Sequence, residues 1–292
     1  MKLPFKKTEA AIGEILRASL PELERLGPAR WVGSRTNGEA HPLTVWIAND
    51  EWLAMEAPLR DVNTPGETWD FLRLDRRLPG LCKFILVTND CSARIRAEIP
   101  IGEENAFERR LRETCAGFEA VLASCSGGRL VFEPHPLPAE GQTSPCDLAA
   151  LCAEAGWASS QRSGVARVEL NARRGSHQAV LENDASGSVR AYVDLVSCGS
   201  WRAESRWALA SLLLSASRVV RLARGFAEDR NRSLTAGFEV CFGARPSAFE
   251  LAHALGALST ACGLSSEEAQ VLEDASVAKA YLDIQWVFRN FL

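Results

Sequence analysis

The stretch IAND at Ile47–Asp50 recurs as LEND at Leu181–Asp184, and AFERRL at Ala106–Leu111 recurs as AFELAH at Ala248–His253. The offset between the copies grows from 134 residues at the first pair to 142 at the second, as small insertions would produce. Between these anchors the two halves of the chain show the same order of hydrophobic patterns. The sequence therefore predicts a tandem repeat of one domain.

The first copy is predicted over residues 1–126. Apolar residues recur at helical spacing over residues 8–26, 68–78 and 103–123. Short apolar runs between turn residues such as Asn37-Gly38 and Asn89-Asp90 indicate strands. The expected strands are 30–35, 43–48, 52–57, 82–88 and 93–101.

A segment with four prolines and three glycines, residues 127–145, is expected to be an extended linker. The second copy, residues 146–292, repeats the order. Its helices are expected at 147–158, at 203–220 and from Pro246, and its strands at 165–172, 177–181, 189–196, 222–228 and 233–242. An amphipathic helix within Ser265–Leu292 is expected to dock on the body, with a role in partner binding as the alternative.

Each copy is therefore predicted to fold as α-β-β-β-α-β-β-α. A five-stranded antiparallel sheet with helices packed on one face places the chain in the α+β class. The middle helix of the second copy is apolar almost all round, which predicts an interface on more than one side.

This order resembles that of the type III secretion chaperone-like superfamily, which includes the bacterial YbjN-like proteins. The paired turns and helix starts quoted above are the residues that support the resemblance, once over residues 4–124 and again over 146–264. The resemblance implies a fold without enzymatic activity that binds extended segments of partner proteins. It also implies that the two copies form a pseudo-dimer within one chain, with a homodimer of whole chains left open.

The net charge of −4 gives the chain no global basic field. We therefore expect neither nucleic acid nor an anionic membrane as a partner, although a local patch is left open. The most apolar stretch, Trp207–Leu222, is interrupted by two arginines and predicts a buried helix instead of a membrane span. The N-terminus lacks the apolar core of a signal peptide, so the expected location is cytoplasmic.

Nine cysteines are scattered without a CxxC pair, so we expect most of them to be reduced and buried. The sequence contains no nucleotide-binding glycine motif, no HExxH and no GxSxG. His41, His135, His177 and His253 are far apart and lack partners at ligand spacing. These patterns predict neither a cofactor nor a metal site, and no catalytic residues can be assigned.

Exposed strand edges and apolar grooves are where an extended peptide can bind. Seven apolar side chains are candidate binding residues: Trp31, Trp46, Trp52, Trp201, Trp207, Leu212 and Leu213. Core filling is the alternative for the three tryptophans of the first meander. The four residues around the middle helix could instead face the other half, a second chain or their own sheet. Five arginines could form a basic face that binds an acidic peptide, or could simply belong to a solvated surface: Arg94, Arg96, Arg109, Arg110 and Arg112.

Two functions follow from these observations. The first is a cytoplasmic, non-enzymatic module that binds a peptide or protein, and it predicts an exposed apolar groove. The second is a small-molecule-binding protein or enzyme whose site is assembled from non-adjacent residues, and it predicts an enclosed pocket with convergent polar groups.

Overall fold

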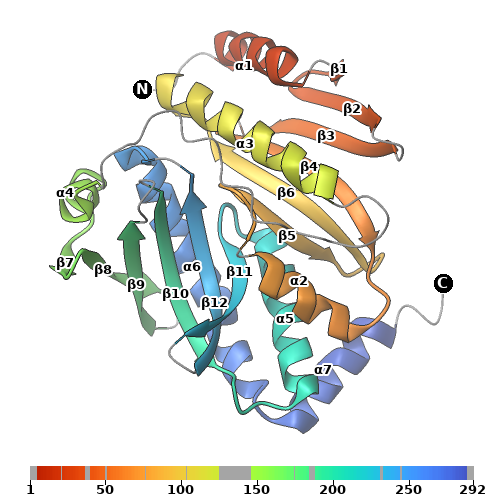
Figure 1. Cartoon of the computed structure of the whole chain (residues 1–292), viewed down its shortest axis with the longest axis vertical. Helices are drawn as coiled ribbons and strands as arrows, with labels where there is room; N and C mark the ends of the chain where they lie inside the picture. The colour runs from red at the N-terminus through yellow and green to blue at the C-terminus, as the bar shows by residue number, and fades with distance from the viewer. Residues whose placement is uncertain are drawn as a thin grey trace.

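The computed structural model describes residues 5–20, 22–36, 40–49, 51–75, 77–102, 104–124, 146–173, 175–183, 188–230, 233–243 and 245–287. The described residues form an α+β molecule of two similar halves, each built on an open antiparallel sheet (Figure 1). The predicted linker lies outside the described residues.

The first half has a six-stranded sheet in the order β1-β2-β3-β4-β6-β5. Its helices are α1 (Phe5–Ser19), α2 (Pro65–Asp75) and α3 (Glu104–Ser124). Its strands are β1 (Glu24–Gly27), β2 (Arg30–Thr36), β3 (Ala40–Ala48), β4 (Trp52–Asp61), β5 (Cys82–Val87) and β6 (Ser92–Pro100).

The second half repeats the arrangement with the sheet order β11-β12-β10-β9-β8-β7. Its helices are α4 (Leu148–Glu154), α5 (Ala203–Val219), α6 (Ala248–Val271) and α7 (Ala275–Val287). Its strands are β7 (Ser159–Arg162), β8 (Val165–Ala172), β9 (Gly175–Asn183), β10 (Val189–Ser197), β11 (Arg224–Arg230) and β12 (Ser233–Phe242). The last helix, α7, packs against α5, as predicted for a helix that docks on the body.

The repeated motifs occupy equivalent places. IAND and LEND end β3 and β9, each at the start of a hairpin to the next strand, and AFERRL and AFELAH lie in the first turns of α3 and α6. Each half contains one strand more than the sequence predicts, namely β1 and β7. Both are four-residue edge strands with mostly exposed side chains, so they lack the alternating pattern that reveals a half-buried strand.

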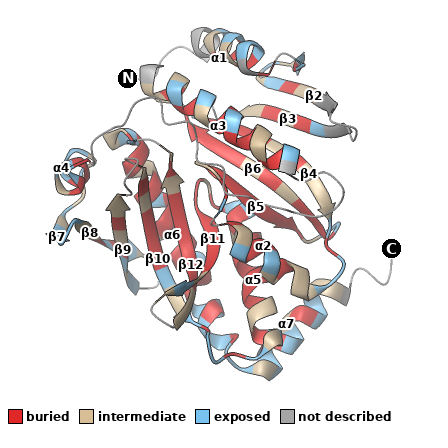
Figure 2. Cartoon of the chain, in the orientation of Figure 1, coloured by how far each residue is buried: buried red, intermediate tan, exposed pale blue. Residues whose placement is uncertain are grey.

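The two halves present their helices to opposite sides of the molecule. Figure 1 shows α3, with α1 packed beside it, in front of the first sheet and α6 behind the second. Alternate residues of β6, including Ile95 and Ala97, are buried against α3, whereas Arg94 and Arg96 point to the other face and bind Glu56 at 2.9 Å. Most of the buried residues therefore lie between sheet and helix and at the contact between the halves (Figure 2).

The middle helices form the contact between the halves, which we call the junction. Helix α2 packs on α5, and each also packs against the edge strand of the other half, α2 on β11 and α5 on β5. Gly225 of β11 makes this approach close, because an added Cβ would lie 2.8 Å from Leu72 Cδ1 of α2 and 3.0 Å from Leu213 Cβ of α5.

Buried cations cross the junction in both directions. From the first half, Lys83 Nζ donates to the carbonyl of Val220 at 2.7 Å and pairs with Glu98 at 2.6 Å. From the second half, Arg224 donates to the carbonyls of Leu78 and Cys82 at 3.0 and 2.9 Å. Each half thus supplies a cation to the segment that follows the other half's middle helix.

A carboxylate holds each of these cations. Glu98 on β6 and Glu239 on β12 occupy equivalent register positions, and Arg224 Nε lies 2.9 Å from Glu239. Although burial acts in the opposite direction, Arg224 and Arg190 hold the pKa of Glu239 below its usual value. The charges are therefore compensated where they are desolvated.

Removing one member of this network should be costly. In Arg224→Met, Glu239 loses a buried partner and two buried carbonyls lose a donor, so the free energy of unfolding should fall by about 3–5 kcal/mol. The matched control is Arg112→Met, which breaks an exposed pair with Glu108 and should cost no more than about 0.5 kcal/mol. Urea unfolding of both variants measures the difference, and equal losses would contradict the assigned role of Arg224.

Asp75, the last residue of α2, gives the junction a dependence on pH. Its Oδ1 accepts a hydrogen bond from the Phe84 amide at 2.8 Å, while its buried Oδ2 has no hydrogen-bond partner in the described part of the chain. Burial raises the pKa of Asp75 well above its usual value, against the opposing charge of Arg224. The folded state therefore binds this proton more tightly than the unfolded chain does.

Asp75→Asn should remove a destabilising ionisation. Because the folded pKa is raised, the contribution of Asp75 to the free energy of unfolding is complete below about pH 4 and declines as the pH rises through the folded pKa. Urea unfolding should show the variant gaining stability relative to the wild type between pH 4 and pH 7. Asp274→Asn is the control of opposite sign, since hydrogen bonds from Ser276 lower the pKa of Asp274. A gain for Asp75→Asn that does not change with pH would refute this assignment.

Candidate functional site

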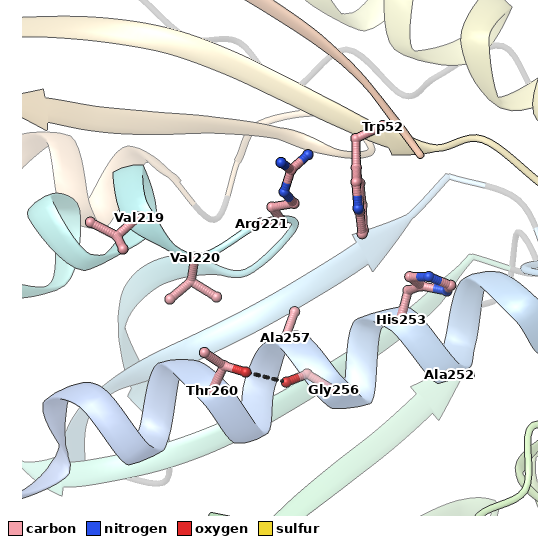
Figure 3. Close-up of a pocket in the computed structure, with 9 residues that line it drawn as sticks. All are labelled: Trp52, Val219, Val220, Arg221, Ala252, His253, Gly256, Ala257 and Thr260. Atoms are coloured by element: carbon pink, nitrogen blue, oxygen red, sulfur yellow. Dashed lines mark hydrogen bonds between the residues drawn. The ribbon is translucent and has the colours of Figure 1, made fainter. Parts of the chain in front are cut away.

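A groove of about 540 Å³ opens at the junction, where the start of β4, the end of α5 and one face of α6 meet (Figure 3). Both halves contribute to it, because β4 belongs to the first half and the helices to the second. We call it the junction groove. Its lining residues are Trp52, Val219, Val220, Arg221, Ala252, His253, Gly256, Ala257 and Thr260.

Small residues of α6 make the hollow. Ala252, Gly256 and Ala257 recur at helical spacing on the face that Figure 3 shows beneath the other lining residues. An added Cβ at Gly256 would meet nothing within 4 Å, so the space above this residue is open. On the opposite side Val219 is 73% exposed, which places a large apolar side chain at the rim.

Aromatic rings close one end of the groove. Trp52 and His253 meet edge to face with centroids 5.3 Å apart, and Phe249 lies 4.2 Å from the same imidazole. His253 Nδ1 is 2.8 Å from the carbonyl of Phe249. Because a carbonyl only accepts, Nδ1 bears the hydrogen, and Nε2 of the neutral ring is left as an acceptor. Gly102 allows this stacking, since a Cβ there would lie 2.4 Å from the Phe249 ring.

Arg221, which follows α5 closely, is the one arginine among the described residues that line the groove. Its guanidinium lies 5.1 Å from the centroid of Trp52, in the range of a cation–π contact. Its Nη1 is buried and has no hydrogen-bond partner among the described residues. No aspartate or glutamate lines the groove in the described part of the chain, so the local charge is positive.

The remaining polar group of the lining is already engaged. The Thr260 hydroxyl donates to the Gly256 carbonyl at 2.9 Å within α6. The groove thus offers apolar walls, an aromatic end, one imidazole and one guanidinium. Chemically, this arrangement suits the binding of an apolar group that carries an acceptor or a negative charge.

The structure places one of the seven candidate binding residues, Trp52, in the junction groove. Trp31 is buried beside α1, where a Cβ at Gly13 would contact its ring at 3.7 Å. Trp46 is half-buried on the face of the first sheet turned away from α3, with the Arg96 guanidinium 5.9 Å from its ring. The three tryptophans of the first meander therefore lie in three different places: Trp31 in the core, Trp46 on a sheet face and Trp52 in the groove.

The other four candidates lie on or just before α5. Leu212 and Leu213 are buried, and the half-buried Trp207 faces α2, where the Thr68 hydroxyl lies 3.3 Å from its carbonyl. Trp201 is buried beside a second hollow of about 490 Å³, lined by Ser200, Trp201, Arg202, Glu273, Asp274, Ala275 and Ser276. The structure does not bring these residues together with Trp52.

The candidate basic face is divided by the fold. Arg110 is fully buried, and its Nε binds Glu250 of α6 at 2.8 Å across the junction. Arg94 and Arg96 are paired with Glu56, and the exposed Arg112 is paired with Glu108. These arginines serve ion pairs within the molecule.

Sequence reasoning did not find most of the groove. The alanines and glycine of α6 resemble any helix core, and Arg221 is one arginine among many. The exposure of Val219 in an otherwise apolar helix becomes visible only when the helix is placed. His253 belongs to the second copy of the AFERRL motif, and its difference from Leu111 of the first copy is the one available signal.

No protein-family model matches the chain. The curated proteins contain no match to it either. One solved structure, of the di-domain ARO/CYC StfQ from the steffimycin biosynthetic pathway, aligns with 97% of this chain and 96% of its own at 11% identity and a TM-score of 0.13. A TM-score of this size carries no argument about fold or function.

None of the helices in the described part of the chain is both long and apolar enough to cross a membrane. The described residues also contain no group of three or more histidine, cysteine or acidic side chains placed to hold a metal ion.

Proposed function

We propose that the protein is a non-enzymatic, cytoplasmic module that binds an extended segment of a partner protein in the junction groove. The two halves act as a pseudo-dimer within one chain, in the manner of the secretion-chaperone and YbjN-like superfamily. The observation that supports this proposal best is the junction groove itself. It is open, mostly apolar and formed by both halves.

An open groove favours a peptide over an enclosed ligand. Because the groove is open to solvent, a segment can extend beyond it, and the aromatic end around Trp52 supplies an anchor for one side chain. Exposure of Val219 at the rim leaves an apolar surface that a partner would cover.

The reciprocal contacts support the pseudo-dimer. Lys83 and Arg224 each bind the segment after the other half's middle helix, an exchange like that across a two-fold interface. The cytoplasmic assignment is supported by the eight described cysteines, which are free thiols and are almost all buried.

A small-molecule ligand is the second candidate. The groove volume of about 540 Å³ falls within the range of small-molecule sites, and Arg221 would supply a polar contact that fixes orientation. A compact apolar acid is the class of molecule that these groups would hold.

Filling the groove should abolish peptide binding without unfolding the protein. Gly256→Leu places a side chain where a Cβ meets nothing, at a helical position where glycine is the poorer helix former by roughly 0.7 kcal/mol. Random decapeptides would be selected on the immobilised wild-type protein, and the affinities of enriched peptides measured by fluorescence anisotropy. Binding to Gly256→Leu should weaken at least about tenfold, with thermal stability kept.

Gln270→Leu is the matched control, since it introduces the same side chain at an exposed position of the same helix outside the groove. It should bind as the wild type does. A selection that enriches no peptide, or peptides whose affinity Gly256→Leu leaves intact, would refute the proposal. A small molecule seen with the wild type by native mass spectrometry, and lost from Gly256→Leu, would favour the second candidate.

A further inference from the structure

We propose that Arg221 makes the junction groove selective for a segment in which a carboxylate lies next to apolar side chains. This inference rests on the proposed function, because it names the chemistry of the peptide that the groove takes. The carboxylate belongs either to an acidic side chain or to the C-terminus of the segment.

Arg221 differs from three other arginines near the junction, each of which has a carboxylate partner. Arg96 binds Glu56, Arg110 binds Glu250, and Arg224 binds Glu239. The Arg221 guanidinium lies over the ring of Trp52, and its buried Nη1 has no hydrogen-bond partner among the described residues. A buried donor without a partner is unfavourable, and a bound carboxylate would satisfy it with a charge-assisted hydrogen bond.

The surroundings leave this guanidinium free for a ligand. Glu98, the carboxylate that contacts the segment just after Arg221, is held by Lys83 and accepts a hydrogen bond from the Leu222 amide at 3.1 Å. Figure 3 shows the Arg221 guanidinium beside Trp52, with His253 on the far side of the ring. The ligand charge therefore meets one fixed cation within apolar walls.

A carboxylate fits this site better than a phosphate group. Phosphate sites combine several donors, often at the N-terminus of a helix. The N-terminus of α6 is closed by a capping box in which Ser247 and the Glu250 carboxylate bind each other's backbone amides. A single guanidinium beside Val219 and Val220 suits one monoanionic group attached to an apolar segment.

The test uses one peptide enriched in the decapeptide selection, made in three versions. The first keeps its carboxylates, the second has its acidic side chains changed to the amides, and the third has a C-terminal amide. Anisotropy titrations on the wild-type protein should show one of the two amide-containing versions binding about 10- to 100-fold more weakly than the original, the range of a charge-assisted hydrogen bond. The version that binds more weakly shows whether the recognised carboxylate belongs to an acidic side chain or to the C-terminus.

The same titrations on Arg221→Gln should show equal affinities for the original peptide and for the version that binds the wild type more weakly. Arg221→Lys should restore part of the difference in affinity. The comparison on the wild-type protein stands even if a variant fails to fold. If all three peptides bind the wild type equally, this inference is overturned while the proposed function stands. If no peptide is enriched, both fall. A difference that persists in folded Arg221→Gln would place the carboxylate on another group and overturn the inference.

Discussion

The exchange of buried cations across the junction is the interaction on which the rest of the structure depends. Lys83 and Arg224 lie on the edge strands β5 and β11, where a sheet edge would otherwise be open to other chains. Each donates to carbonyls of the opposite half, and each is neutralised by a carboxylate on the neighbouring strand. The two edges are thus closed by the halves themselves.

This exchange also builds the groove. The chain is held just before Arg221, because Arg96 donates to the Arg218 carbonyl at 2.8 Å and Lys83 donates to the Val220 carbonyl at 2.7 Å. Beyond it, the Leu222 amide is fixed by Glu98. Arg221, the cation of the candidate site, is therefore positioned by residues of the other half, so the groove exists because the halves are docked. Such prior positioning would lower the entropic cost of binding the flexible segment that we propose as the ligand.

The repeat in the sequence was sufficient to predict two similar α+β halves, and the amphipathic pattern within Ser265–Leu292 predicted a last helix that docks on the body. The sequence could not reveal β1 and β7, because exposed four-residue edges have no hydrophobic period. Nor could the sequence reveal that Arg110 is buried. The exposed Arg112 lies two residues away in the same stretch, and Glu250, the partner of Arg110, is 140 residues away.

The candidate site was less predictable than the fold. Trp52 was named from composition and position, but its role depends on three elements that meet only in the folded chain. Whether an arginine has a partner depends on the residues that surround it in the folded chain, and no local sequence pattern predicts this. Small residues such as Gly256 mark a groove only when nothing packs above them.

Native-state hydrogen exchange tests most directly whether the two halves form one unit. The measured amides would be those of β5 that bond to β6 and those of β11 that bond to β12. If the junction joins the halves, both sets should exchange with the same free energy of opening, equal to that of global unfolding. Opening of one strand at a clearly lower free energy than the other would show that the halves unfold independently and would contradict this account.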